Sequence, residues 1–238
     1  MPRRLTQHAS RRYARAVTTT PTPLRRFTGV LRIAAGLLVL AAVVTQITDQ
    51  LANDAFVPQE YFAYFTIESS LMNVVTLVVA GVYALRHSFD TALLTSVRMA
   101  IVTYAVVTGC VYNVLLRNIP DTGFQGIGWP NDVLHVIIPI YIALDWLVSP
   151  GRARLGWSAI WVAVSYPLAW VAFTLIRGIS TGWFPYPFLR PEGPGGWPSV
   201  VVYVVGIASF IVILAALAIV TTRGIRRRIG ATVEHPAS

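Results

Sequence analysis

Six long apolar segments constrain this chain more than any other feature of its sequence. Each approaches or exceeds the roughly 20 apolar residues that a helix needs to cross the hydrocarbon core of a bilayer. Only 12% of the residues are charged, whereas a water-soluble domain carries about 25%. Since a helix satisfies its own backbone hydrogen bonds in lipid, we predict an all-α bundle of six transmembrane helices. The predicted helices lie at 27–48, 62–86, 93–116, 131–149, 155–177 and 198–222.

The basic residues predict how this bundle is oriented. All 19 are arginines, and the formal net charge is +9. Because cytoplasmic loops and tails are enriched in basic residues, we predict a multi-pass protein of the plasma (inner) membrane with both termini in the cytoplasm. Fifteen arginines fall on the predicted cytoplasmic side: Arg3, Arg4, Arg11, Arg12, Arg15, Arg25, Arg26, Arg86, Arg98, Arg152, Arg154, Arg223, Arg226, Arg227 and Arg228. Three fall in the opposite loops: Arg117, Arg177 and Arg190.

The same features divide the chain into three parts. A disordered basic cytoplasmic tail is expected at 1–26, the membrane domain at 27–222, and a second basic tail at 223–238. We interpret the arginines as residues that determine the topology and whose positive charges also contact anionic membrane lipids. The lack of a basic folded module argues against nucleic-acid binding. The single cysteine, Cys110, excludes a disulfide framework and a multi-cysteine metal site, and the sequence indicates no cofactor.

Two polar residues are predicted to meet near the outer face of the bundle. With both termini inside, the second and fourth helices begin at the outer face. Thr66 then lies about one turn below that face, and His135 lies at a similar depth in the fourth helix. A threonine hydroxyl becomes a nucleophile when a base takes its proton, and a neutral histidine is the usual base. We therefore predict a catalytic pair, with Thr66 as nucleophile and His135 as general base.

Other polar residues near this level are candidates for supporting roles. A catalytic histidine needs a group that orients its second ring nitrogen, and the oxyanion that forms on the attacked carbonyl needs hydrogen-bond donors. The candidates for orienting the ring are Asp132, Asn131 and Glu68. The candidate oxyanion donors are Asn73, Asn113 and backbone amides, and the candidate residues at the substrate mouth are Ser70, Arg177, Trp183 and Tyr186.

Each of these residues also has an ordinary structural explanation. A threonine in a membrane helix commonly bonds to the carbonyl four residues before it, and a buried histidine can hold a purely structural hydrogen bond. Arg177 can extend to the outer interface, and Trp183 and Tyr186 can belong to an interfacial aromatic belt. Asp145 can be a helix-end charge at the cytoplasmic headgroups.

One short motif suggests a different kind of esterase. Residues Gly178-Ile179-Ser180-Thr181-Gly182 match G-x-S-x-G, the nucleophile elbow of α/β-hydrolases. That motif requires a strand-to-helix turn at the edge of a sheet, and here it follows a predicted membrane helix. We interpret its glycines as the residues that let the chain turn at the outer interface.

Three local patterns together resemble those of a known family. They are Phe65-Thr66, Asn131-x-x-x-His135-x-x-x-Pro139 and Trp183…Tyr186-Pro187-Phe188-Leu189. In their order and spacing the chain resembles, over roughly residues 27–222, the androgen-induced and androgen-dependent TFPI-regulating proteins and their bacterial six-helix relatives. The resemblance implies an intramembrane threonine hydrolase of lipid esters, typically fatty acid esters of hydroxy fatty acids. Its nucleophile and catalytic histidine would be Thr66 and His135.

The sequence therefore favours an enzyme, a carboxylic ester hydrolase that acts on a lipid ester near the outer leaflet. The alternative is a non-catalytic membrane protein that binds a lipid, or transports protons or solutes, through the same polar cluster. A b-type haem protein is disfavoured because only His135 lies inside the predicted bundle and two axial ligands are needed. A rhomboid-like protease is disfavoured because the Gly-x-Ser-Gly nucleophile pattern is missing from the sequence. The oligomeric state is left open.

Overall fold

The computed structural model describes residues 20–117, 119 and 124–231, with the backbone alone for residues 224–231. Within this part all regular structure is helical, and six helices are long and apolar enough to cross a membrane. The prediction of an all-α, multi-pass membrane protein is confirmed at this level. The candidate spans are Pro23–Ala52, Phe65–Arg86, Ala92–Leu116, Trp129–Val148, Trp157–Thr181 and Gly196–Arg223. Residues 1–19 of the first predicted tail, with five of the counted arginines, and residues 232–238 of the second lie outside the described residues.

Four spans are continuous helices or nearly so, and two contain a stretch of π-helix. The continuous helices are α2 (Pro23–Ala52), α4 (Phe65–Arg86), α8 (Ile160–Thr181, after the 3-10 turn η3, Trp157–Ala159) and α9 (Gly196–Ala231). The third span joins α5 (Ala92–Val111) to the π-helix η1 (Tyr112–Leu116). The fourth joins α6 (Trp129–Asp132), the π-helix η2 (Val133–Ile137) and α7 (Ile138–Val148). Two short elements lie between spans, α3 (Pro58–Tyr61) and η4 (Pro187–Leu189).

Local sequence explains where several helices begin and end. Helix α2 starts four residues before the predicted position because Thr22 caps it, accepting a hydrogen bond from the Arg25 N–H at 3.3 Å, and Pro23 fits the first helical position. Thr91 caps α5 in the same way, through the Leu94 N–H at 3.1 Å. Helix α8 ends at Gly182, whose φ of +71° favours glycine.

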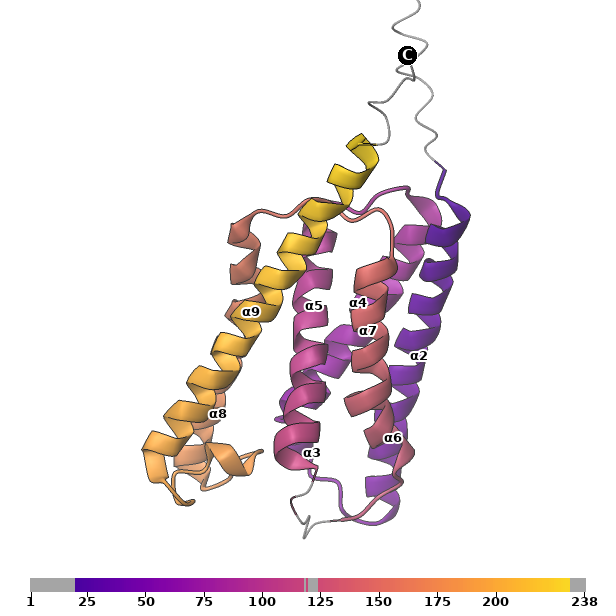
Figure 1. Cartoon of the computed structure of the whole chain (residues 1–238). Coiled ribbons are helices and arrows are strands. Elements are labelled where there is room, and N and C mark those ends of the chain that lie inside the picture. Colours follow the sequence, from indigo (N-terminus) through magenta and orange to yellow (C-terminus); the bar gives the residue numbers. More distant parts are fainter. Residues whose placement is uncertain (1–19, 118, 120–123, 232–238) are drawn as a thin grey trace, which may run out of the picture.

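The helices form a four-helix group with a pair attached to its side. Figure 1 shows α2, α4, α5 and α7 side by side, and contacts among them are extensive. Helices α8 and α9 pack on each other and on α5. Helix α2 begins and α9 finishes at the same end of the bundle, which we name the terminal end; α3 and α6 lie at the other, which we name the α3 end (Figure 1).

Large apolar side chains cover much of the outer surface of this bundle. Leu93, Val114, Trp161, Ile176 and Val202 are each about 70% exposed or more. A soluble protein rarely exposes so much apolar surface, whereas lipid chains solvate it. This surface agrees with the membrane location that helix length and composition indicate.

Close contact between α2 and α4 depends on two glycines that face each other. A Cβ atom at Gly81 would lie 2.7 Å from the Gly29 carbonyl oxygen, and one at Gly29 would lie 2.9 Å from the Gly81 carbonyl oxygen. Small residues at membrane helix interfaces let backbones approach in this way. The contact holds α4, which carries Thr66, against the first helix.

We expect the substitution Gly81→Val to destabilise the bundle by about 1–3 kcal/mol, the usual cost of overpacking a close contact. The added side chain meets the Gly29 backbone, which cannot move aside without separating the helices. The matched control is Gly206→Val, since a Cβ at Gly206 has no neighbour within 4 Å. Thermal unfolding of the purified protein in detergent measures the difference, and equal midpoints for the two variants would contradict this packing.

Candidate functional site

Thr66 and His135 lie within hydrogen-bonding distance at the α3 end of the bundle. Thr66 is the second residue of α4, and its Oγ1 lies 3.3 Å from Nε2 of His135 on η2. Both residues are buried, at 8% and 9% exposure. The carbonyl four residues before Thr66 belongs to Phe62, which precedes the helix. The ordinary bond of a membrane threonine to its own helix is therefore replaced by a bond to the histidine.

The second ring nitrogen of His135 decides which way this hydrogen bond runs. Nδ1 lies 2.9 Å from the main-chain oxygen of Asn131. A carbonyl oxygen only accepts, so Nδ1 carries the proton and Nε2 is left with a lone pair. The Thr66 hydroxyl must then donate to Nε2. This is the proton arrangement that a threonine nucleophile and a histidine general base require.

The imidazole ring is also held by an aromatic neighbour. The ring of Tyr112, the first residue of η1, stacks on His135 with a centroid separation of 3.9 Å and an interplanar angle of 24°. The Tyr112 hydroxyl accepts a hydrogen bond of 2.5 Å from the side-chain amide of Asn131. Asn131 thus holds the ring through its carbonyl and holds the stacking partner through its side chain.

The two π-helical stretches bring these residues together. Asn113 of η1 donates to the His135 carbonyl at 3.1 Å and to the Gly109 carbonyl at 2.8 Å. Pro139 has no N–H, so it cannot occupy the His135 carbonyl four residues back. Gly109 of α5 allows α7 to approach closely, because a Cβ atom at this position would lie 2.9 Å from the Pro139 side chain. Irregular turns of this kind often occur at functional sites.

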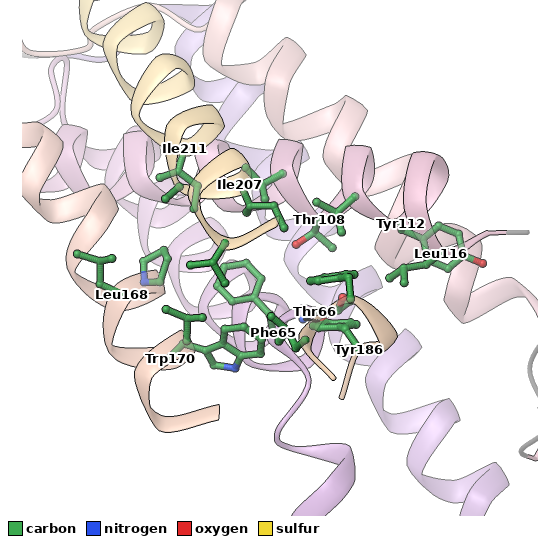
Figure 2. A pocket seen from close by; sticks show the side chains of 18 of the residues that line it. Phe65, Thr66, Thr108, Tyr112, Leu116, Leu168, Trp170, Tyr186, Ile207 and Ile211 are labelled. Atoms are coloured by element: carbon green, nitrogen blue, oxygen red, sulfur yellow. Dashed lines mark hydrogen bonds between the residues drawn. The ribbon is translucent and has the colours of Figure 1, made fainter. Parts of the chain in front are cut away.

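An apolar cavity opens beside the threonine. Figure 2 shows Phe65, Thr66, Trp170 and Tyr186 among its lining side chains, with further walls from α5, α8 and α9. Its empty volume is about 800 Å³, including the part open to the surroundings. A cavity with such apolar walls suits an acyl chain, and it places that chain next to the Thr66 hydroxyl.

The loop after α8 covers the head of α4. The Thr66 N–H donates to the Tyr186 hydroxyl at 3.4 Å, and the Tyr186 ring lies against Tyr64 and Phe188. Burial raises the pKa of Tyr186 to about 12, so its phenol keeps its proton at neutral pH. Trp183 meets Tyr64 edge to face at 5.8 Å. Of the predicted mouth residues, Tyr186 therefore reaches the reacting pair itself.

Arg177 contacts another of the predicted mouth residues, Trp183. Its guanidinium carbon sits 4.6 Å above the Trp183 ring, and it does not line the cavity. Ser70 is buried one turn beyond Thr66 on α4 and does not line the cavity either. Both residues support the surroundings of the site rather than its mouth.

The group that orients the histidine differs from two of the three candidates. Asp132 is exposed, and Glu68 accepts a hydrogen bond of 2.5 Å from the Tyr166 hydroxyl on α8. The structure replaces both carboxylates with the main-chain carbonyl of Asn131. A backbone acceptor cannot be recognised from residue types alone. The one indication in the sequence is that Asn131 and His135 are four residues apart, so that they lie one helical turn from each other.

The predicted oxyanion donors are also placed elsewhere. Asn113 is bonded to two carbonyls and accepts from Arg117 at 2.7 Å. Asn73 lies seven residues beyond Thr66, about 10 Å along the helix axis, and its buried Oδ1 has no hydrogen-bond partner among the described residues. Neither side chain adjoins the Thr66 hydroxyl. The Tyr186 hydroxyl and the first turn of α4 take that position instead.

The G-x-S-x-G motif shapes the covering loop. A Cβ at Gly178 would lie 2.1 Å from the Phe184 ring, and Gly182 adopts the left-handed conformation that ends α8. The Ser180 hydroxyl donates to the Arg177 carbonyl at 2.8 Å. The motif thus serves the turn, and its serine is engaged with its own helix.

Comparisons with known proteins add no relative to this picture. Neither a protein-family model, nor a curated protein, nor a solved structure matches the chain. Among the described residues, no group of three histidine, cysteine, aspartate or glutamate side chains could hold a metal ion. The chemistry of the site must therefore be argued from its own geometry.

We expect His135 to carry its proton on Nδ1 and none on Nε2 in the resting protein. The reason is that the Asn131 carbonyl can only accept a hydrogen bond. Nitrogen-15 NMR of histidine-labelled protein distinguishes the two tautomers, and His135→Gln assigns the signal. Because Asn131 sets the tautomer, Thr66→Val should leave it unchanged. A resting ring protonated on Nε2 would contradict the proposed direction of the Thr66 hydrogen bond.

Proposed function

We propose that the protein is an intramembrane hydrolase of lipid esters that uses Thr66 as nucleophile and His135 as general base. The observation that carries the proposal is the 3.3 Å contact between Thr66 Oγ1 and His135 Nε2, combined with the occupation of Nδ1 by the Asn131 carbonyl. The resemblance to the androgen-induced and androgen-dependent TFPI-regulating proteins supports the same two residues. It also suggests fatty acid esters of hydroxy fatty acids as the substrate class.

The reaction follows from the positions of these atoms. Thr66 Oγ1 attacks the ester carbonyl while Nε2 takes the hydroxyl proton, and a tetrahedral intermediate forms. Its collapse breaks the bond to the alcohol oxygen, which leaves with the proton returned by Nε2. A water molecule then attacks the acyl-threonine as Nε2 takes its proton, and collapse of this second intermediate breaks the bond between the acyl carbon and Thr66 Oγ1, which takes the proton back from Nε2. The products are a carboxylic acid, an alcohol and the free threonine.

The negative charge of the intermediate has two stabilising groups within reach. The Tyr186 hydroxyl accepts from the Thr66 N–H, and in the reaction its own proton would bond to the oxyanion beside Thr66. Thr66 also stands in the first turn of α4, where the helix dipole favours negative charge. Donors that are fixed before the reaction are the usual source of large rate enhancements.

The apolar cavity supports a substrate with a long hydrocarbon chain. The chain would lie among α5, α8 and α9 with the ester at the head of α4. We propose that the terminal end faces the cytoplasm of a plasma (inner) membrane, as the arginine distribution indicates. The ester would then react near the outer headgroups, where water is present.

We expect Thr66→Val to reduce ester turnover to background, and His135→Gln to reduce it by about 100-fold or more, as loss of a general base does. The matched control is Thr103→Val, because Thr103 is a buried threonine that donates to the Met99 carbonyl at 2.9 Å. Mass spectrometry of the fatty acid released from a fatty acid ester of a hydroxy fatty acid measures turnover. Equal activity in the wild type and both site variants would overturn the proposal.

A long-chain fluorophosphonate probe separates the enzyme from the alternative of a non-catalytic lipid-binding or transport protein. The Thr66 oxygen would displace fluoride and remain bonded to phosphorus. Labelling should be lost in Thr66→Val and kept in Thr103→Val. Saturable lipid binding without labelling of Thr66 would favour the non-catalytic alternative.

We expect Tyr186→Phe to lower kcat by about 100-fold, the usual cost of removing one oxyanion donor, with little change in KM. The phenyl ring keeps the contacts with Tyr64 and Phe188 and loses only the hydroxyl. Tyr83→Phe is the control, since Tyr83 stacks on His87 at the terminal end. Steady-state kinetics on the same ester measures both variants, and an unchanged kcat would remove Tyr186 from the oxyanion site.

A further inference from the structure

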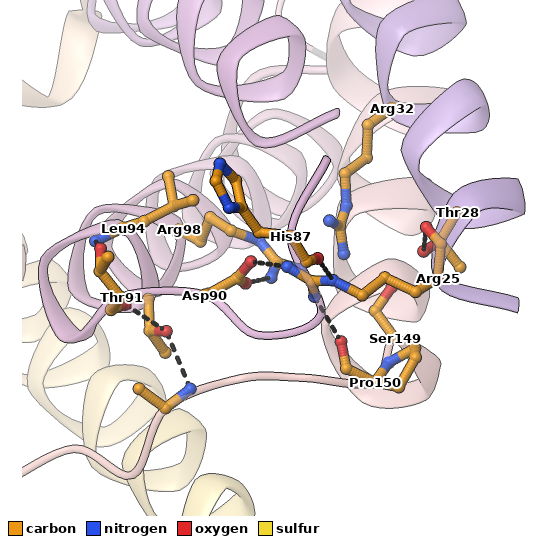
Figure 3. Close-up of polar contacts among 12 residues, drawn as sticks. Arg25, Thr28, Arg32, His87, Asp90, Thr91, Leu94, Arg98, Ser149 and Pro150 are labelled. Carbon is orange, nitrogen blue, oxygen red and sulfur yellow. Dashed lines mark hydrogen bonds and ion pairs between the residues drawn. The ribbon is translucent and has the colours of Figure 1, made fainter. Parts of the chain in front are cut away.

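A chain of buried ion pairs occupies the terminal end of the bundle, away from the proposed active site. Asp90, in the loop between α4 and α5, pairs with Arg25 at 2.6 Å and with Arg98. Arg98 also pairs with Asp145 of α7 at 3.0 Å, and Arg32 of α2 pairs with the same carboxylate at 3.0 Å. Figure 3 shows Arg25 and Arg98 meeting at Asp90, with Arg32 beside them.

This arrangement corrects two expectations from the sequence. The sequence places Arg25 and Arg98 on the cytoplasmic side, among the positive charges expected to contact anionic lipids; both are instead buried inside the protein, and Arg98 belongs to the second turn of α5. Asp145 was considered a helix-end charge, but it is buried between two arginines. These side chains bind elements of the bundle to one another.

Among the described residues, two guanidinium groups of this cluster keep hydrogen-bond donors without partners. The donors are Nη1 and Nη2 of Arg32 and all three nitrogens of Arg152, and all five atoms are buried. The Tyr141 hydroxyl, one turn before Asp145 on the same face of α7, is also buried and has no partner within the described part of the chain. Arg25, in contrast, is satisfied by Asp90 and by the carbonyls of His87 and Pro150.

Arg152 adds a charge that the cluster does not balance. Its guanidinium carbon lies 4.8 Å above the Trp146 ring, and that of Arg98 lies 5.9 Å from the same ring. Four guanidinium groups thus meet two carboxylates, so within the described residues two positive charges of the cluster have no paired carboxylate. Burial lowers the pKa of Arg152 to about 10, so the group still carries its charge at neutral pH. Buried charges are normally paired.

We propose that Arg32 and Arg152 bind an oxyanion of the phosphate class at the terminal end of the bundle. Each guanidinium presents a planar set of donors that matches two oxygens of one anion. A carboxylate has only two oxygens and fills one such set, whereas a phosphate group offers enough oxygens for both arginines and for the Tyr141 hydroxyl. Two uncompensated positive charges also suit a phosphate anion.

This site is separate from the proposed active site and does not depend on it. Asp145 follows His135 by ten residues on the same span, about 15 Å along the helix axis. Arg152 lies in the loop that follows α7, at the level where lipid headgroups and soluble anions both reach the protein. The phosphate group can therefore come from an anionic lipid or from solution.

The test measures how phosphate stabilises the full-length protein against heat. In neutral detergent, inorganic phosphate is titrated against sodium chloride at equal ionic strength. In nanodiscs, phosphatidylglycerol is compared with phosphatidylcholine. We expect a saturable rise of the unfolding midpoint with phosphate, with phosphatidylglycerol, or with both. A rise in detergent identifies a soluble anion as sufficient, whereas a rise in nanodiscs alone identifies a lipid headgroup.

Arg152→Gln should weaken the apparent binding by about 10- to 100-fold, the range expected for loss of hydrogen bonds to a charged group. The matched control is Arg154→Gln, an exposed arginine of the same loop whose loss changes the net charge equally. Arg152→Lys keeps the charge without the planar donors, so it should weaken binding less and remains informative if Arg152→Gln does not fold. The proposal would be overturned if phosphate and phosphatidylglycerol raised the unfolding midpoint no more than chloride and phosphatidylcholine do. It would also be overturned if they raised the midpoints of Arg152→Gln and Arg154→Gln equally.

Discussion

Inside a bilayer, a polar side chain must find its hydrogen-bond partner within the protein, because the surrounding lipid offers none. In this chain the requirement is met in two groups at opposite ends of the bundle. At the α3 end, Thr66, Asn131 and His135 satisfy one another. At the terminal end, two aspartates join three arginines from α2 and α5. These partnerships fix which helices are neighbours and at what depth they meet.

The backbone irregularities at the α3 end follow from the same requirement. A regular helix through the fourth span would direct its carbonyls to its own N–H groups, and Pro139 already lacks one of them. The π-helical turns η1 and η2 direct the Asn131 carbonyl to the histidine ring and the His135 carbonyl to Asn113. The His135 ring is thus held in place where the fourth span lacks part of its regular main-chain hydrogen bonding, as is common in π-helical turns at functional sites.

Much of the fold was predictable from the sequence, because span length and hydropathy are properties of contiguous residues. The similar depth of Thr66 and His135 was predictable too, since topology determines at which face each helix begins. The Asn131 carbonyl was not, because every residue has one and only the local π geometry aims it. The paired arginines were missed for another reason: three of the four ion pairs join residues 47 to 113 positions apart, and no periodicity links them.

The ion pairs and the glycine contact act on the same group of four helices that carries Thr66 and leads into His135. Thr66 is on α4, which packs tightly on α2, and His135 continues into α7, which Asp145 ties to α2 and α5. Helices α8 and α9 take no part in these pairs; they pack mainly on α5, Tyr166 of α8 also bonds to Glu68 of α4, and both helices supply much of the cavity wall. The Thr66–His135 contact therefore joins two spans of the four-helix core. The cavity is lined by α8 and α9 as well as by α4, α5 and η1. A bulkier side chain at Ala208 or Ile211 would thus change the cavity from the side of α9, while the bonds between Thr66, His135 and Asn131 keep their own supports.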